Sequence, residues 1–163
     1  STALVYSAST NSSVEARIDI PDVSNSAVFF GFSDAKGEGN TYMAIAYTGD
    51  AEVDTATNAV GFLIDPESAT IGASSLLLVN TKAGTQAAID TGTDWADNDT
   101  RNLRVDLDTS GNATFWVDGV AAGYKASAIT AATPLCGTVQ ASSRTAAAST
   151  VWVRSFDAWS DIV

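Results

Sequence analysis

The chain has 163 residues, 45% of them hydrophobic, so it is long and apolar enough to form one domain with a sizeable core. Eight Lys and Arg residues against nineteen Asp and Glu residues give a formal net charge of -11, which argues against nucleic acid or an anionic membrane as a partner. The absence of histidine and the single cysteine exclude a Ser-His-Asp triad and an intrachain disulfide.

The first 13 residues begin with an apolar patch, Leu4, Val5 and Tyr6, and continue as a stretch rich in Ser, Thr and Asn. Such a segment suits a docking arm, and it suits equally the first strand of the domain itself. We therefore expect a single domain over residues 1–163, with residues 1–13 as a candidate arm.

From residue 14 the hydrophobic pattern has a period of two, which is typical of strands. In 14–20, the apolar residues from Val14 to Ile20 share one face, and Glu15, Arg17 and Asp19 share the other. Further strands are predicted at 27–34, 42–49, 58–65, 75–82, 103–107, 113–118, 137–144 and 150–156. Turn signals recur about every ten residues, so the sequence predicts an all-β, two-sheet antiparallel sandwich.

The segment 90–99 is rich in acidic side chains. Hard carboxylate oxygens in a loop suit calcium, which makes Asp94, Asp97 and Asp99 candidate ligands. Asp and Asn are equally common in ordinary turns, so a plain loop is the alternative. One short helical turn is predicted at 94–100, and no other cofactor is expected.

The hairpin around residues 103–118 carries two adjacent aromatic residues. Alternation directs Phe115 and Val117 into the core with the apolar residues of 103–107, and it directs Trp116 outward, near Arg104 or Asp106. A tight turn is predicted at 118–119.

The same alternation in 150–156 directs Val151 and Val153 inward, and Trp152 and Arg154 outward. Outward tryptophans such as Trp116 and Trp152 can stack on sugar rings or anchor a protein interface. Alternatively, the 1–10 arm or the tail 156–163 covers them.

Nearly the whole chain resembles the concanavalin A-like lectin/glucanase jelly roll, in the version found in bacteriophage virion proteins. The resemblance is carried by "NAVGFLID", "LLLVNTKAGTQAAIDTG", "RNLRVDLDTSGNATFWVDGVAAG", "TPLCGTVQASSRTAAASTVWVRSF" and "VEARIDIPDVSNSAVFFGFSDA". It implies a sandwich with one flat-to-concave sheet, which carries the sugar site in the lectins and glucanases. In phage proteins it implies a stable module on the particle surface.

The retaining glucanases of this superfamily use two carboxylates in an E-x-D-x-x-E pattern on one strand. The four glutamates of this chain, Glu15, Glu38, Glu52 and Glu67, form no such pattern. Glu15 and Asp19 share a strand face, but the intervening Arg17 suggests charge pairing. We therefore expect no enzymatic activity.

These observations favour a non-enzymatic structural module, a capsid decoration protein at the virion surface. It would contact a capsid or other virion protein, as a monomer or a homo-oligomer such as a trimer. The expected contacts are Leu4 and Tyr6 at one end, and Trp152, Arg154 and Trp159 at the other. The alternative is an extracellular carbohydrate-binding, lectin-like module that uses Trp116 or Trp152 to hold a glycan. A glycoside hydrolase is the third alternative.

Overall fold

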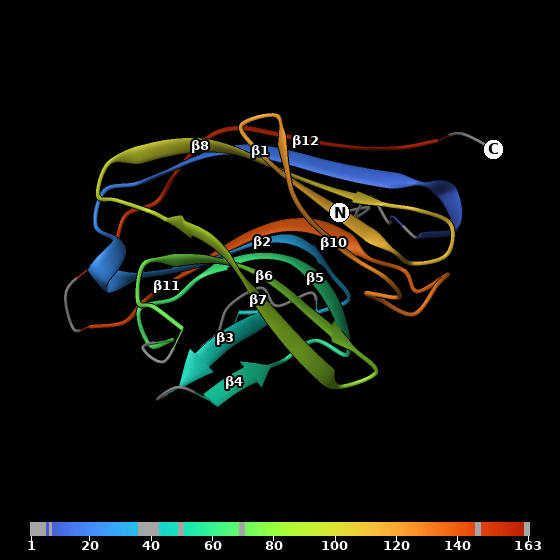
Figure 1. The fold of residues 1–163 in the computed structure, drawn as a ribbon, viewed down its shortest axis with the longest axis horizontal. Helices are drawn as coiled ribbons and strands as arrows, with labels where there is room; N and C mark the ends of the chain where they lie inside the picture. The colour runs from blue at the N-terminus through green and yellow to red at the C-terminus, as the bar shows by residue number, and fades with distance from the viewer. Residues whose placement is uncertain are drawn as a thin grey trace.

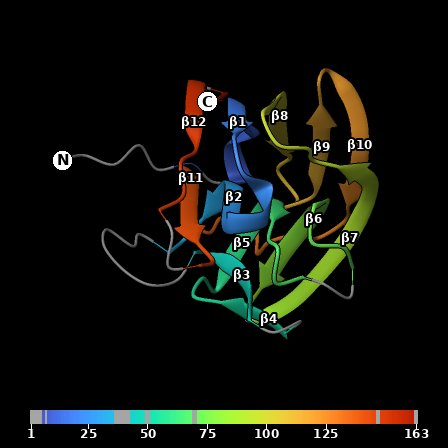
Figure 2. The ribbon, with the colours of Figure 1, turned by 90° about the vertical axis from the view of Figure 1, so that its left-hand side faces the viewer.

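The computed structural model describes residue 6 and residues 8–35, 43–48, 51–68, 71–145 and 148–161. Within these residues the chain forms two five-stranded antiparallel sheets that pack face to face, and one additional two-stranded hairpin (Figures 1 and 2). This is the all-β jelly-roll sandwich of the concanavalin A-like type, so the predicted fold class is confirmed. The helices in the described residues are three-residue 3₁₀ turns, too short to cross a membrane.

The first sheet has the strand order β10-β9-β8-β1-β12. Its strands are β1 (Ser12–Ile20), β8 (Asp99–Leu107), β9 (Ala113–Val117), β10 (Val120–Lys125) and β12 (Trp152–Ser160). The second sheet has the order β11-β2-β5-β6-β7. Its strands are β2 (Ser26–Ser33), β5 (Asn58–Ile64), β6 (Ser75–Lys82), β7 (Thr85–Asp94) and β11 (Cys136–Ser143).

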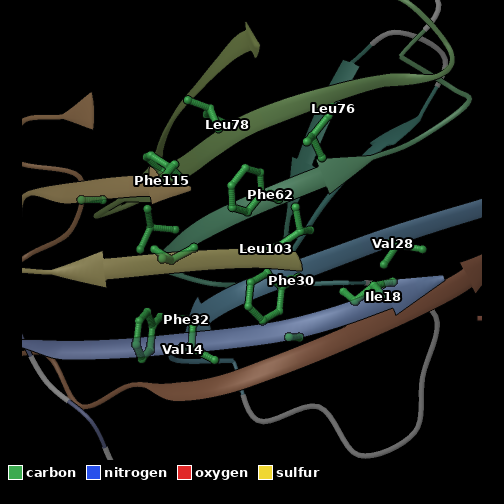
Figure 3. Close-up of a cluster of buried hydrophobic side chains, with 14 of the residues drawn as sticks. Val14, Ile18, Val28, Phe30, Phe32, Phe62, Leu76, Leu78, Leu103 and Phe115 are labelled. Carbon is green, nitrogen blue, oxygen red and sulfur yellow. The ribbon is translucent and has the colours of Figure 1, made fainter. Parts of the chain in front are cut away.

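Alternate residues of both sheets meet in one apolar core, as Figure 3 shows for part of it. The hairpin residues predicted to face inward do so: Leu103, Val105, Leu107 and Phe115 are buried, and Val117 packs against them half buried. Phe115 makes an edge-to-face contact with Phe62 of the opposite sheet, with ring centroids 5.5 Å apart. The period of two in the sequence therefore identified the core face correctly.

A second apolar cluster lies on the other side of the second sheet. The strands β3 (Ile45–Thr48) and β4 (Ala51–Asp54) form a hairpin. In Figure 1 the second sheet arches over this hairpin. Buried residues of the sheet and of the segment around β3 pack together there: Ala27, Phe29, Met43, Ala44, Ile45, Ala46, Tyr47, Ala56, Ala59, Leu63, Leu77 and Val79. The second sheet is therefore buried on both faces over its middle part.

Two local predictions differ from the structure. The segment 94–100 contains no helix, because β7 ends at Asp94, β8 begins at Asp99, and the residues between them form a turn. In that turn Trp95 is buried, and its indole nitrogen donates to the Asp99 carbonyl at 3.2 Å. Strand β12 continues to Ser160, so the described part of the tail after residue 156 belongs to the sheet and does not cover the tryptophans.

The two ends of the described chain lie against each other. Tyr6 is buried, forms a bridge with Leu135, and donates its hydroxyl proton to the Ala158 carbonyl at 3.1 Å. The Asp161 amide donates to the Thr10 carbonyl at 3.0 Å. Residues 12 and 13 belong to β1 and are not part of an arm, because both pair with β8 and β12. Leu4, predicted as a contact residue, lies outside the described residues.

Candidate functional site

The outward side chains of the first sheet form what we call the open face. Its register brings distant parts of the chain into one row across three strands, because Glu15 of β1 pairs with Arg104 of β8, and Arg104 pairs with Trp116 of β9. Alternation directs all three side chains away from the core. The outward orientation predicted for Trp116, beside Arg104 and Asp106, is therefore correct.

These side chains line a shallow depression of about 200 Å³, together with Asn102 and Gly119. Gly119 belongs to the tight turn that joins β9 to β10, in which Asp118 and Gly119 have φ values of 51° and 80°. The Asp118 carboxylate accepts a hydrogen bond from the backbone amide of Asn102, on the neighbouring strand β8, at 2.9 Å. The predicted turn therefore exists, and it fixes one rim of the depression.

Asp106 holds the two largest side chains of the depression in place. One of its oxygens accepts from the Trp116 indole nitrogen at 2.8 Å. The other accepts from Arg104 Nε and from the Ser13 hydroxyl, both at 2.7 Å. With both oxygens engaged, Asp106 orients the indole and the guanidinium relative to each other before any ligand arrives.

Other polar groups at the depression remain free to bind a ligand. Among the described residues, the Glu15 carboxylate and the Asn102 side-chain amide have no hydrogen-bond partner, and the terminal nitrogens of Arg104 have none either. The depression therefore offers the Glu15 carboxylate as an acceptor, the Arg104 guanidinium as a donor, and the Asn102 amide as both. These groups surround the indole of Trp116.

The predicted contact residues of β12 lie on the open face outside this depression. Trp152 is 51% exposed, and the Arg154 guanidinium lies 5.4 Å from its ring centroid and 2.8 Å from the Asp19 carboxylate. Asp19 therefore pairs with Arg154 rather than with Arg17, contrary to the sequence interpretation. Trp159 is 40% exposed and lies against Arg104. Tyr6, by contrast, lies in the core.

The predicted calcium ligands do not converge. Asp94 accepts from the Ser75 hydroxyl, Asp97 from the Val23 amide, and Asp99 from Ala96 and Arg101. The carboxylates therefore brace three different segments instead of surrounding one point. Across the residues that the structure describes, no group of three or more His, Cys, Asp or Glu side chains is placed to hold a metal ion. The segment is a turn region in which the three predicted carboxylates do not form one common site.

The resemblance placed a sugar site on the concave sheet, which here is the second sheet. Among the described residues, the middle part of this sheet offers no such platform. The side chains on this face of the sheet are apolar there, and the segment around β3 covers them. The Gln140 side-chain oxygen accepts from the Ala44 amide at 2.6 Å, and the buried Asp65 carboxylate accepts from the Tyr47 amide at 2.8 Å. We call this region the covered face.

The sequence interpretation missed Glu15 and Asn102 as site residues. Alternation places both outward, and that part of the signal was visible. What the sequence does not reveal is that β1 pairs with β8 in a register that sets Glu15 beside Arg104. A long-range pairing between strands so far apart in the chain leaves no local pattern.

No protein-family profile matches the sequence, and no curated protein sequence matches it either. The structure, however, matches solved structures over almost its full length. A carbohydrate-binding module of Bacillus subtilis superimposes with a TM-score of 0.56 at 10% identity, over 93% of this chain and 76% of that one. Sheep galectin-11 gives a TM-score of 0.54 at 10% identity, over 96% and 95%.

A marine alginate lyase of Zobellia galactanivorans also superimposes, with a TM-score of 0.51 at 12% identity, over 97% of this chain and 65% of that one. At such low identities these similarities establish the jelly-roll fold alone. A bacteriophage connection is absent from the three names, and the particle role inferred from the sequence stays a prediction.

Proposed function

We propose that this protein is a non-catalytic carbohydrate-binding module, and that the depression on the open face is its sugar site. The observation that carries the proposal is the arrangement around Trp116. Its indole lies beside the free Glu15 carboxylate, the free Asn102 amide and the terminal nitrogens of Arg104. This was the alternative in the sequence analysis, and the site geometry favours it over the particle role.

The chemistry of this arrangement suits a sugar ring. A pyranose presents an apolar C–H surface that packs on an indole, and hydroxyl groups around its rim that both donate and accept. Glu15 would accept from hydroxyl groups, and Arg104 and Asn102 would donate to them. Because Asp106 already fixes Trp116 and Arg104, binding would cost little side-chain ordering. The similar fold of a carbohydrate-binding module and a galectin supports the proposal.

The site residues also support binding without catalysis. Glycoside hydrolysis by the common mechanisms needs two carboxyl groups that flank the scissile bond. Among the described residues that line the depression, Glu15 is the only carboxylate, and its neighbour Asp157 on β12 lies outside the lining. Asp106 lies nearby, but both of its oxygens are engaged by neighbouring side chains.

A glycan array followed by calorimetry on the best ligand tests this proposal. Trp116→Ala should weaken binding at least about tenfold, since it removes the stacking surface. Trp152→Ala, an exposed tryptophan of the same sheet outside the depression, should bind like the wild type. Folding of each variant is checked by its thermal unfolding. Binding that is equally strong in Trp116→Ala, or release of reducing ends from the ligand, would contradict the proposal.

A second candidate function is attachment to another protein through β12, as the sequence analysis expected for a particle protein. Seven large hydrophobic side chains of the described residues are exposed, and four of them lie on this edge strand: Trp152, Val153, Phe156 and Trp159. Edge strands with apolar side chains are frequent contact surfaces. Sedimentation equilibrium tests self-association into a trimer. Trp152→Ala should then lower the association constant without changing sugar affinity.

A further inference from the structure

Trp159 extends the aromatic surface of the open face beyond the depression. It pairs with Ser13 of β1, and Ser13 in turn pairs with Asp106 of β8. Trp159 therefore points to the same side as Trp116. The residue is 40% exposed although the Arg104 guanidinium lies 5.2 Å from the ring centroid. Arg104 thus contributes to the depression and also reaches across β1 to Trp159.

The two indoles come from strands that are not neighbours in the sheet. Trp116 lies on β9 and Trp159 on β12, and β8 and β1 lie between them. Three strand spacings of about 4.8 Å separate the two strands by about 14 Å. A chain of several rings could contact both indoles and pass over Arg104 on the way.

The surface between the two indoles is rich in acceptors. Glu15 and Asp157 are direct neighbours across β1 and β12, and neither has a hydrogen-bond or ion-pair partner among the described residues. Two adjacent carboxylates attract hydroxyl protons and repel carboxylate or sulfate groups of a ligand. The net charge of -11 acts in the same direction over longer distances.

We propose that the open face binds a neutral oligosaccharide along a stripe that runs from Trp116 over Arg104 to Trp159. The depression holds one ring, Trp159 stacks on a ring further along the chain, and Glu15 and Asp157 exclude acidic sugars. This inference rests on the proposed function, because it extends the same site.

The test is calorimetry with ladders of manno-, gluco- and fructo-oligosaccharides from monosaccharide to tetrasaccharide, beside guluronate and galacturonate ladders of the same lengths. In the neutral series that binds, the wild type should gain about tenfold in affinity between the monosaccharide and the tetrasaccharide. Trp159→Ala should lose this gain and keep the monosaccharide affinity. Trp152→Ala serves as the matched control and should keep both.

Asp157→Lys provides an independent test that leaves both indoles in place. It should raise the affinity for the uronate ladders and leave that for the neutral monosaccharide unchanged.

The inference is overturned if Trp159→Ala retains the length-dependent gain, or if the wild type binds uronates as tightly as neutral sugars. If no ladder binds at any length, the proposed function fails along with it. Neutral binding that depends on Trp116 but not on length or on Trp159 overturns the inference alone.

Discussion

The two sheets of this sandwich have outer faces of opposite character. On the covered face, Phe29, Leu63 and Leu77 are fully buried beneath the segment that contains β3. On the open face, the outward positions of the first sheet carry charged, polar and indole side chains, and several of these are exposed. The covered face therefore contributes to stability, whereas the open face presents groups to a ligand. A shared fold thus does not determine which of its faces is available for binding.

The covered face should be the more costly one to alter. Phe29→Ala removes a fully buried ring, so the free energy of unfolding should fall by about 3 to 5 kcal/mol. Tyr124→Ala, on the open face, should change it by less than about 0.5 kcal/mol, because the side chain is largely exposed. Urea unfolding of both variants measures the difference. Equal losses of unfolding free energy in the two variants would show that the segment around β3 does not exclude water from the covered face.

Asp106→Asn should act mainly on binding. The new amide keeps one acceptor oxygen. Its NH₂ group replaces the second acceptor oxygen, so either Trp116 or Arg104 loses the oxygen to which it donates. The free energy of unfolding should fall by roughly 1 kcal/mol, and sugar affinity should fall about tenfold because the indole and guanidinium lose their shared anchor. Calorimetry and thermal unfolding separate the two effects. Full sugar affinity in this variant would mean that Trp116 and Arg104 keep their positions without Asp106.

The smallest expected effect concerns the turn between β8 and β9, which supports the open face. Burial alone would raise the pKa of Asp108, but hydrogen bonds from Asn112 and Ser110 outweigh it and lower the pKa below the ordinary value. The stability that this carboxylate contributes is therefore complete above its unfolded pKa of about 3.9, and it is lost as the pH falls through the lower folded value.

Asp108→Asn removes that contribution. The variant should be slightly less stable than the wild type near neutral pH, and the two unfolding midpoints should converge below about pH 3. Midpoints that differ by the same amount at both pH values would assign the effect to geometry rather than to charge.

The sequence predicted the core better than the site. Leu103, Val105 and Phe115 were identified from alternation alone, since one buried face imposes a period of two on each strand. The edge strands β7 and β10 were missed, because partial exposure on both sides removes that alternation.

The site depends on register, and no local pattern encodes register between distant strands. Trp116 and its neighbour Asp106 were predicted because one short hairpin carries both. Glu15 was read with Arg17 and Asp19 on its own strand, although its structural neighbours are Arg104 and Asp157. The apolar strands of the second sheet were recognised, but the sequence did not indicate that a hairpin covers them.

The closeness of the first and last described residues bears on how this domain can be joined to other proteins. Tyr6, Thr10 and Asn11 lie against residues 158–161, held by hydrogen bonds from Tyr6, Asn11 and Asp161. The chain thus enters and leaves the sandwich at neighbouring points. A domain with this geometry can be inserted into a surface loop of a carrier protein without separating its strands. Such an insertion would display the open face while both connections stay at one edge of the first sheet.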